Sequence, residues 1–204
     1  MHTPDFFVHA PCLVLRDPLA EFLGAARGGL VEYKYADSVK FAGHSCPTVA
    51  GAHLLAAKAL ALLYPGATPE RGAIRVEMRD AQDAGVTGVI AGVLGLITGA
   101  AGDGGFKGIA GRFARRGLLA FGVPLKGLVR FTRTDTGASV ELDYRPEGIA
   151  GDPAMTQALA RACGTEATGA ERERFATLWQ ARVREILLEG PGGSALVEVA
   201  QASA

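Results

Sequence analysis

The stretch from Ala84 to Gly102 carries no charged side chain, and this property limits the folds that the chain can adopt. Its length approaches the roughly 20 residues that a helix needs to cross a bilayer. However, glycines interrupt it, Asp83 and Asp103 bracket it, and it lacks the aromatic belt and positive flank of most membrane spans. We therefore predict a glycine-rich helix that is buried in a soluble protein, without membrane contact.

Glycine recurs in this stretch at alternating spacings of three and four residues, which places the glycines on one face of a helix. Each glycine costs about 1 kcal/mol of helix stability relative to alanine, so the pattern needs a compensating gain. Close approach of another backbone supplies one, either inside the core or across the two-fold axis of a homodimer. The alternative is a flat ligand, such as a tetrapyrrole, that lies on the stripe. The glycines are Gly85, Gly88, Gly92, Gly95, Gly99 and Gly102.

The composition favours a single soluble domain. A chain of 204 residues, 49% of them hydrophobic, can bury one sizeable core. Its 21 basic and 21 acidic residues balance, which argues against a polycation that binds nucleic acid. Three scattered cysteines are too few for a disulfide framework, and the first residues do not have the pattern of a signal peptide. We predict a cytoplasmic protein.

Hydrophobic periodicity predicts a mixture of helices and strands. Two of the expected strands flank the turn Asp135-Thr136-Gly137 and should form an antiparallel hairpin. We therefore predict an α+β fold, in which a mixed or antiparallel sheet packs against helices. One domain should span residues 1–190, and residues 191–204 should form a loose tail. The strands are expected at 30–35, 74–78, 128–134 and 138–144, and the helices at 17–28, 47–64, 84–102, 153–162 and 170–189.

The sequence FAGHSCPTVAG, residues 41–51, holds the side chains with the clearest chemical signal. Cys46 stands directly before Pro47, and proline is typical of the first position of a helix. A helix N-terminus favours the thiolate form of a cysteine. A thiolate beside the imidazole of His44 is a donor pair that suits Zn²⁺. Two ligands do not make a site, so the pattern alone also fits a buried cysteine at a helix start.

The residues Gly43-His44-x-Cys46-Pro47, followed by a helix rich in alanine, resemble the signature of the FmdE-like family of formylmethanofuran dehydrogenase components. The similarity continues through the strand RVEMRDAQDA, the turn GDGGFKG and a hairpin to the C-terminal helix, and covers about residues 36–190. The resemblance implies a metal, usually zinc, held by the histidine and cysteine of the motif and a downstream cysteine. Asp80 stands where that cysteine would be, so the implied ligands here are His44, Cys46 and Asp80.

Four further residues are candidates for the wall of a ligand pocket. Thr48 replaces the glycine that follows Cys-Pro in the family, and its hydroxyl can face the site. Asp83 and Lys107 belong to the matched strand end and the matched turn. His53 lies about 10 Å further along the helix than Cys46. It therefore fits a pocket wall or a buried, hydrogen-bonded histidine better than a ligand of the same metal.

A tract without acidic residues runs from Gly104 to Thr134 and includes Lys107, Arg112, Arg115 and Arg130. It fits either a solvated surface or a site for a small anionic ligand. No known nucleic-acid-binding motif accompanies it, so we do not expect nucleic acid as a partner.

Three classes of function are consistent with these residues. Our main prediction is a metal-binding protein that holds zinc, or another divalent transition metal, at the His-x-Cys corner. The second class is a tetrapyrrole carrier, with haem on His44 or Cys46. The third is an enzyme that uses metal-bound water or the Cys46 thiolate. The sequence indicates no substrate, and we expect a homodimer.

Overall fold

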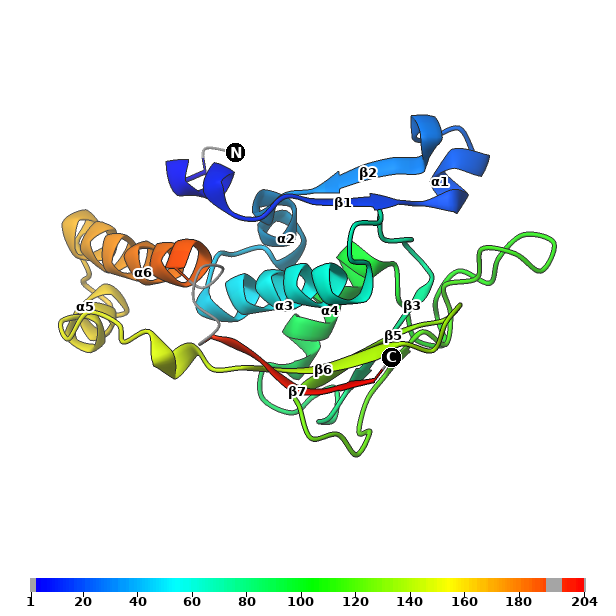
Figure 1. Ribbon diagram of the computed structural model, residues 1–204. Helices are drawn as coiled ribbons and strands as arrows, with labels where there is room; N and C mark the ends of the chain where they lie inside the picture. The colour runs from blue at the N-terminus through cyan, green and yellow to red at the C-terminus, as the bar shows by residue number, and fades with distance from the viewer. Residues whose placement is uncertain (1–2, 190–195, 204) are drawn as a thin grey trace.

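A computed structural model describes residues 3–189 and 196–203 of the protein, and Figure 1 traces their path. The chain forms an α+β fold, as predicted, with a five-stranded mixed sheet and a separate two-stranded antiparallel sheet. The central helices lie between the two sheets (Figure 1).

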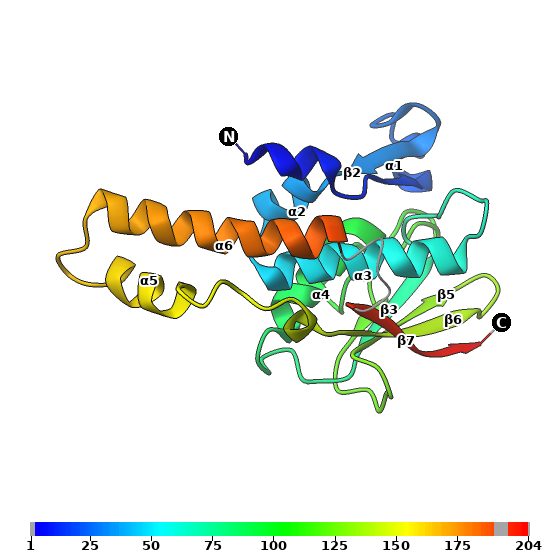
Figure 2. The same cartoon turned by 60° about the vertical axis from the view of Figure 1, so that its left-hand side comes forward.

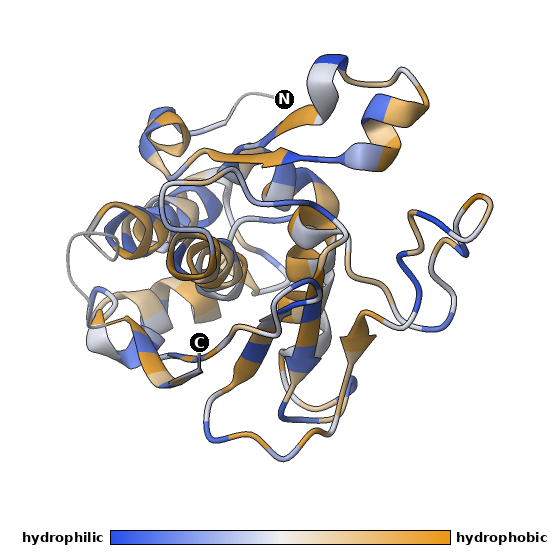
Figure 3. Ribbon diagram, turned by 45° about the vertical axis from the view of Figure 1, so that its right-hand side comes forward, coloured by the Kyte–Doolittle hydropathy of each residue, from blue (hydrophilic) through white to orange (hydrophobic). Residues whose placement is uncertain are grey.

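The larger sheet has the strand order β4-β3-β5-β6-β7. Its neighbouring strands pair antiparallel, except that β3 and β4 run parallel. Along β3 and β5, buried apolar residues alternate with more exposed polar ones, so one face of the sheet packs on the core (Figure 3). The strands are β3 (Ile74–Met78), β4 (Leu119–Ala120), β5 (Val129–Arg133), β6 (Ser139–Tyr144) and β7 (Val197–Ser203).

Two apolar helices, α3 (Pro47–Leu63) and α4 (Thr87–Thr98), pack against each other and against this sheet. Helix α3 begins at Pro47, as predicted. Helix α4 is shorter than the uncharged stretch that contains it, because Gly85 and Gly99 flank it with left-handed φ angles of 53° and 77°. Gly99 ends the helix as its C-cap.

The glycines inside α4 allow close packing within the chain. A Cβ atom at Gly92 would lie 2.8 Å from the ring of Phe41, which belongs to α2 (Tyr35–Ala42). A Cβ atom at Gly95 would lie 2.8 Å from the carbonyl oxygen of Ala100. Other parts of the chain therefore cover the stripe at both positions, in agreement with the packing interpretation rather than with an open groove for a flat ligand.

The N-terminal region differs from the prediction. Strands β1 (Leu13–Arg16) and β2 (Leu30–Tyr33) form the smaller sheet. Helix α1 (Pro18–Phe22) and a 3₁₀ turn (Arg27–Gly29) connect them, so the helix expected at 17–28 ends early. A second 3₁₀ turn (Asp5–His9) precedes β1.

The alternating pattern predicts that Tyr35 closes a strand, but Tyr35 begins α2. Asp37 accepts a hydrogen bond of 3.0 Å from the backbone N–H of Lys34, which stabilises the start of that helix. The Tyr35 ring is fully buried between the rings of Phe7 and His53. The alternation of apolar and polar residues over 30–35 therefore includes Tyr35, the first residue of a helix, because its side chain is also buried in the core.

Helices α5 (Met155–Ala162) and α6 (Gly169–Glu189) form an antiparallel pair that projects from the body of the molecule (Figure 2). A 3₁₀ turn (Pro146–Gly148) leads from β6 toward α5. The second half of α6 returns to the core, where Val183, Ile186 and Leu187 are buried and the helix packs on α3. None of the described helices is long and apolar enough to span a membrane.

The C-terminal segment corrects the expectation of a loose tail. Residues 197–203 form β7, which pairs antiparallel with β6 from Ser139↔Ser203 to Tyr144↔Val197. Leu196 and Val197 are buried. The other residues of the expected tail, 191–195 and 204, lie outside the described part of the chain.

Candidate functional site

Cys46 is the N-cap of α3 and is buried, with 8% of its surface exposed. Its Sγ accepts a hydrogen bond of 3.4 Å from the backbone N–H of Val49, and Pro47 occupies the first helical position. The predicted placement of Cys46 at a helix N-terminus is therefore confirmed. The sulfur already satisfies one of the free N–H groups of the first helical turn.

Contacts from distant parts of the chain hold the residue before Cys46 in place. The hydroxyl of Ser45 donates to Oε1 of Gln180 at 3.0 Å, so the Tyr35 hydroxyl donates to Ser45 at 2.9 Å. Trp179 Nε1 donates to the Ser45 carbonyl oxygen at 2.9 Å. Two residues of α6 therefore hold Ser45 in position, although they follow it by more than 130 residues in the sequence.

The predicted zinc ligands do not gather into a metal site. His44 is exposed, and its Nδ1 lies 3.0 Å from the carbonyl oxygen of Ala42. Asp80 is half exposed and pairs with Arg79 at 3.3 Å. Across residues 3–189 and 196–203, no three or more His, Cys, Asp or Glu side chains are arranged to hold a metal ion. The donor set therefore does not fit zinc as arranged, and zinc and haem binding stay predictions.

A cavity of about 370 Å³ opens between the starts of α3 and α4 and the end of β3. It contains two of the predicted site residues, Thr48 and Asp80, although they are 32 positions apart in the sequence. We call it the corner pocket. Its lining residues are Thr48, Asp80, Ala84, Gly85, Val86, Thr87, Ile90, Leu128, Tyr144 and Pro146.

Tyr144 forms one wall of the corner pocket and depends on a glycine behind it. Its hydroxyl donates to the carbonyl oxygen of Pro47 at 2.8 Å. A Cβ atom at Gly51 would overlap the Tyr144 ring, so glycine makes room for the ring against α3. Burial raises the pKa of the Tyr144 phenol, which therefore stays protonated and keeps its hydrogen bond to Pro47.

The pocket combines an apolar wall with a few polar groups. Ile90, Leu128 and Pro146 supply apolar surface, while the hydroxyls of Thr48 and Thr87 and the carboxylate of Asp80 supply hydrogen-bonding groups. The N-termini of α3 and α4, which both border the pocket, carry partial positive charge. Such a combination is typical of sites for small organic molecules.

The other candidate pocket residues lie elsewhere. His53 is fully buried on α3, with Nδ1 3.0 Å from the Ser38 hydroxyl and Nε2 2.8 Å from the Pro11 carbonyl oxygen. Burial lowers the pKa of its ring, so it is the buried, hydrogen-bonded histidine of the alternative interpretation. Asp83 and Lys107 are exposed, and neither belongs to the lining of the corner pocket.

Two polar residues of the pocket were not among the predicted site residues. Thr87 begins α4 and Tyr144 ends β6. Thr87 lies within the segment that resembles the family, only four residues after Asp83, and this proximity was the available signal. Tyr144 carried no such signal, because its position depends on the pairing of β6 with the distant strand β7.

No family model matches the sequence, and no curated protein matches it either. The resemblance to the FmdE-like family of formylmethanofuran dehydrogenase components therefore stays a prediction based on the motif around His44 and Cys46.

Proposed function

We propose that this protein binds a small organic molecule in the corner pocket. The observation that carries the proposal is the meeting of Thr48, Asp80, Thr87 and Tyr144 around one cavity with an apolar wall. Asp80 accepts hydrogen bonds from a hydroxyl or amino group of the ligand, and the apolar wall packs against its carbon frame. The buried Cys46 supports this pocket as the cap of α3.

A matched pair of variants tests this proposal. Ligands are first identified by a thermal-shift screen of small metabolites, and their dissociation constants are then measured by calorimetry. Asp80→Asn removes a charge from the pocket wall, whereas Asp83→Asn removes a charge from the exposed surface nearby. We expect Asp80→Asn to weaken binding about tenfold, the equivalent of one charge-assisted hydrogen bond, and Asp83→Asn to change it less than about twofold.

Equal effects of the two substitutions would contradict a ligand in the corner pocket. Metal analysis of the purified protein separates this proposal from the prediction based on the family resemblance. Equimolar zinc that disappears in Cys46→Ser would assign the corner to a metal instead.

The proposal also includes the oligomeric state, the cellular location and a second ligand. We infer a homodimer in the cytoplasm, with Phe41, Val86 and Val89 as the exposed apolar residues nearest the glycine stripe. A single monomeric species in sedimentation at micromolar concentration would contradict the dimer. The tract from Gly104 to Thr134 contains basic but no acidic residues, and this excess of positive charge supports the proposal of a small anionic ligand.

A further inference from the structure

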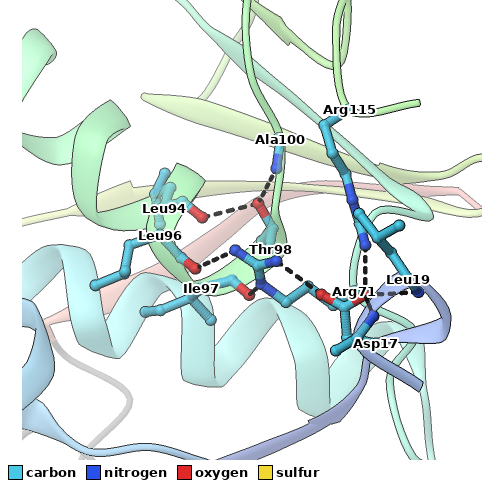
Figure 4. Close-up of polar contacts among 10 residues, drawn as sticks. Asp17, Leu19, Arg71, Leu94, Leu96, Ile97, Thr98, Ala100 and Arg115 are labelled. Atoms are coloured by element: carbon cyan, nitrogen blue, oxygen red, sulfur yellow. Dashed lines mark hydrogen bonds and ion pairs between the residues drawn. The ribbon is translucent and has the colours of Figure 1, made fainter. Parts of the chain in front are cut away.

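One carboxylate and two arginines form a buried cluster between the N-terminal region and the core (Figure 4). Asp17 Oδ2 accepts a hydrogen bond from Arg71 at 2.8 Å, and Asp17 Oδ1 accepts one from Arg115 at 2.6 Å. Asp17 and Arg115 expose only 4% and 7% of their surface. The cluster therefore carries two positive charges against one negative charge, largely shielded from water.

The two arginines differ in how many of their N–H groups are hydrogen-bonded. Arg71 also donates to the carbonyl oxygens of Leu96 and Ile97, at 2.9 and 3.2 Å, in the last turn of α4. The negative end of the α4 dipole thus offsets part of its charge. Arg115 bonds to Asp17 through Nη2, while its buried Nε has no hydrogen-bond partner among the described residues. A buried N–H without a partner is unfavourable, and this one belongs to a charged group.

Arg115 also lines a second cavity, of about 470 Å³, which we call the arginine pocket. Arg16, Arg71, Arg112 and Arg115 line it, against the single carboxylate of Glu70. The remaining lining residues are Pro18, Gly72, Ala73, Phe113, Ala114 and Thr134. None of them belongs to the corner pocket.

Local backbone features shape the arginine pocket around these guanidinium groups. A Cβ atom at Gly72 would overlap Nη1 of Arg115, so this position requires glycine. Phe113 has a left-handed φ of 63°, which is unfavourable for a residue other than glycine. It places its ring under the Arg112 guanidinium, 4.6 Å from the ring centroid. Arg112 makes no ion pair with any described residue and is free to meet a ligand.

We propose that the arginine pocket binds a phosphate or phosphomonoester group between Arg112 and Arg115. A doubly charged tetrahedral anion offers acceptor oxygens to both guanidinium groups. It also neutralises the excess positive charge of the buried cluster. The remaining volume, beside Pro18 and Phe113, holds a small organic body attached to the phosphate.

The test uses inorganic phosphate as the probe, at constant ionic strength maintained with chloride. Because Arg115 Nε is shielded from water, its N–H exchanges slowly and gives an observable signal in ¹H–¹⁵N spectra. Arg115→Lys identifies this signal by removing it. We expect the signal to shift and to saturate as phosphate is added. An Nε–H signal that does not move up to about 10 mM phosphate, where even a weak millimolar site would be largely filled, would overturn the proposal.

A matched pair of arginine variants separates specific binding from a general effect of charge. Arg112→Gln changes a residue of the pocket wall, and Arg116→Gln changes an exposed arginine outside it. We expect Arg112→Gln to weaken phosphate binding about tenfold, the loss of one charge-assisted hydrogen bond, and Arg116→Gln to leave it within about twofold. If both variants weaken binding equally, the protein attracts phosphate only through its surface charge, and the pocket is not a site.

Discussion

Replacing Asp17 by asparagine removes the charge that holds Arg71 and Arg115 together. Asparagine has the same shape and is an equally good N-cap, so the hydrogen bonds from the backbone N–H groups of Leu19 and Ala20 survive. The substitution leaves two buried or half-buried guanidinium groups without their carboxylate. Breaking such a buried pair costs about 3–5 kcal/mol. We therefore expect Asp17→Asn to lower the free energy of unfolding by about 3 kcal/mol, the lower end of that range.

Urea denaturation followed by circular dichroism measures this loss, and Asp135→Asn provides the control. Asp135 also pairs with an arginine, Arg133, but its side chain is 54% exposed, so that pair contributes no more than about 1 kcal/mol. Asp17→Ala removes the cap as well and should cost roughly 1 kcal/mol more than Asp17→Asn. If Asp17→Asn and Asp135→Asn destabilise the protein equally, the buried cluster does not hold the N-terminal region.

The same ion pairs predict how stability depends on pH. Burial alone would raise the pKa of Asp17, but hydrogen bonds from Arg71 and Ala20 and the charge of Arg115 outweigh it and lower the pKa below 3.8. The stabilisation is therefore complete above about pH 4 and is lost as the pH falls through the folded-state pKa. Asp17→Asn should abolish this part of the acid-induced loss of stability.

Three other predictions concern the helix α3. Gly51→Ala should lower the free energy of unfolding by up to about 2 kcal/mol, because the clash with the Tyr144 ring, about 1–3 kcal/mol, is offset by a gain of about 1 kcal/mol in helix propensity. Combined with Tyr144→Ala in a double-mutant cycle, the same change should become stabilising. Cys46→Ser should keep the fold and cost no more than about 1–2 kcal/mol, because serine is a good N-cap, and metal analysis should give the same metal content for both proteins. The free energy of unfolding should fall as the pH drops below about 6.5, because burial lowers the folded-state pKa of His53 and the unfolded histidine binds a proton first. Denaturation at about pH 5–7 should show this slope. A flat profile would contradict a buried neutral ring.

Local patterns predicted the central elements well because their own residues determine them. Pro47 at the first helical position and the Ala/Leu run after it specify α3. Strict alternation specifies β3, whose bounds agree with the prediction. The turn Asp135-Thr136-Gly137 joins β5 and β6 as expected, with Gly137 at a left-handed φ of 79°. These signals lie within a few residues of the element that they form.

The missed features depend on contacts between distant residues. Strand β7 exists because β6 offers it a partner, and its own small and polar residues resemble a tail. Asp17 was recognised as an N-cap, but its pairing with Arg71 and Arg115 joins residues 54 and 98 positions apart. At the candidate site, the meeting of Thr48 and Asp80 followed from the family resemblance. Among the described residues, no group of three metal-binding side chains forms around Cys46. Whether such side chains converge depends on the directions in which they point, and no local sequence pattern encodes these directions.

The place of β7 at the edge of the larger sheet has a consequence for how the protein is synthesised. Residues 197–203 are translated after β3, β5 and β6, and 52 residues separate the end of β6 from the start of β7. Until β7 is released, β6 presents an unpaired edge, and such edges recruit strands from other chains. Translation that stalls before β7 emerges, or a tag fused after it that hinders pairing, should therefore promote aggregation of nascent chains whose other strands are already in place.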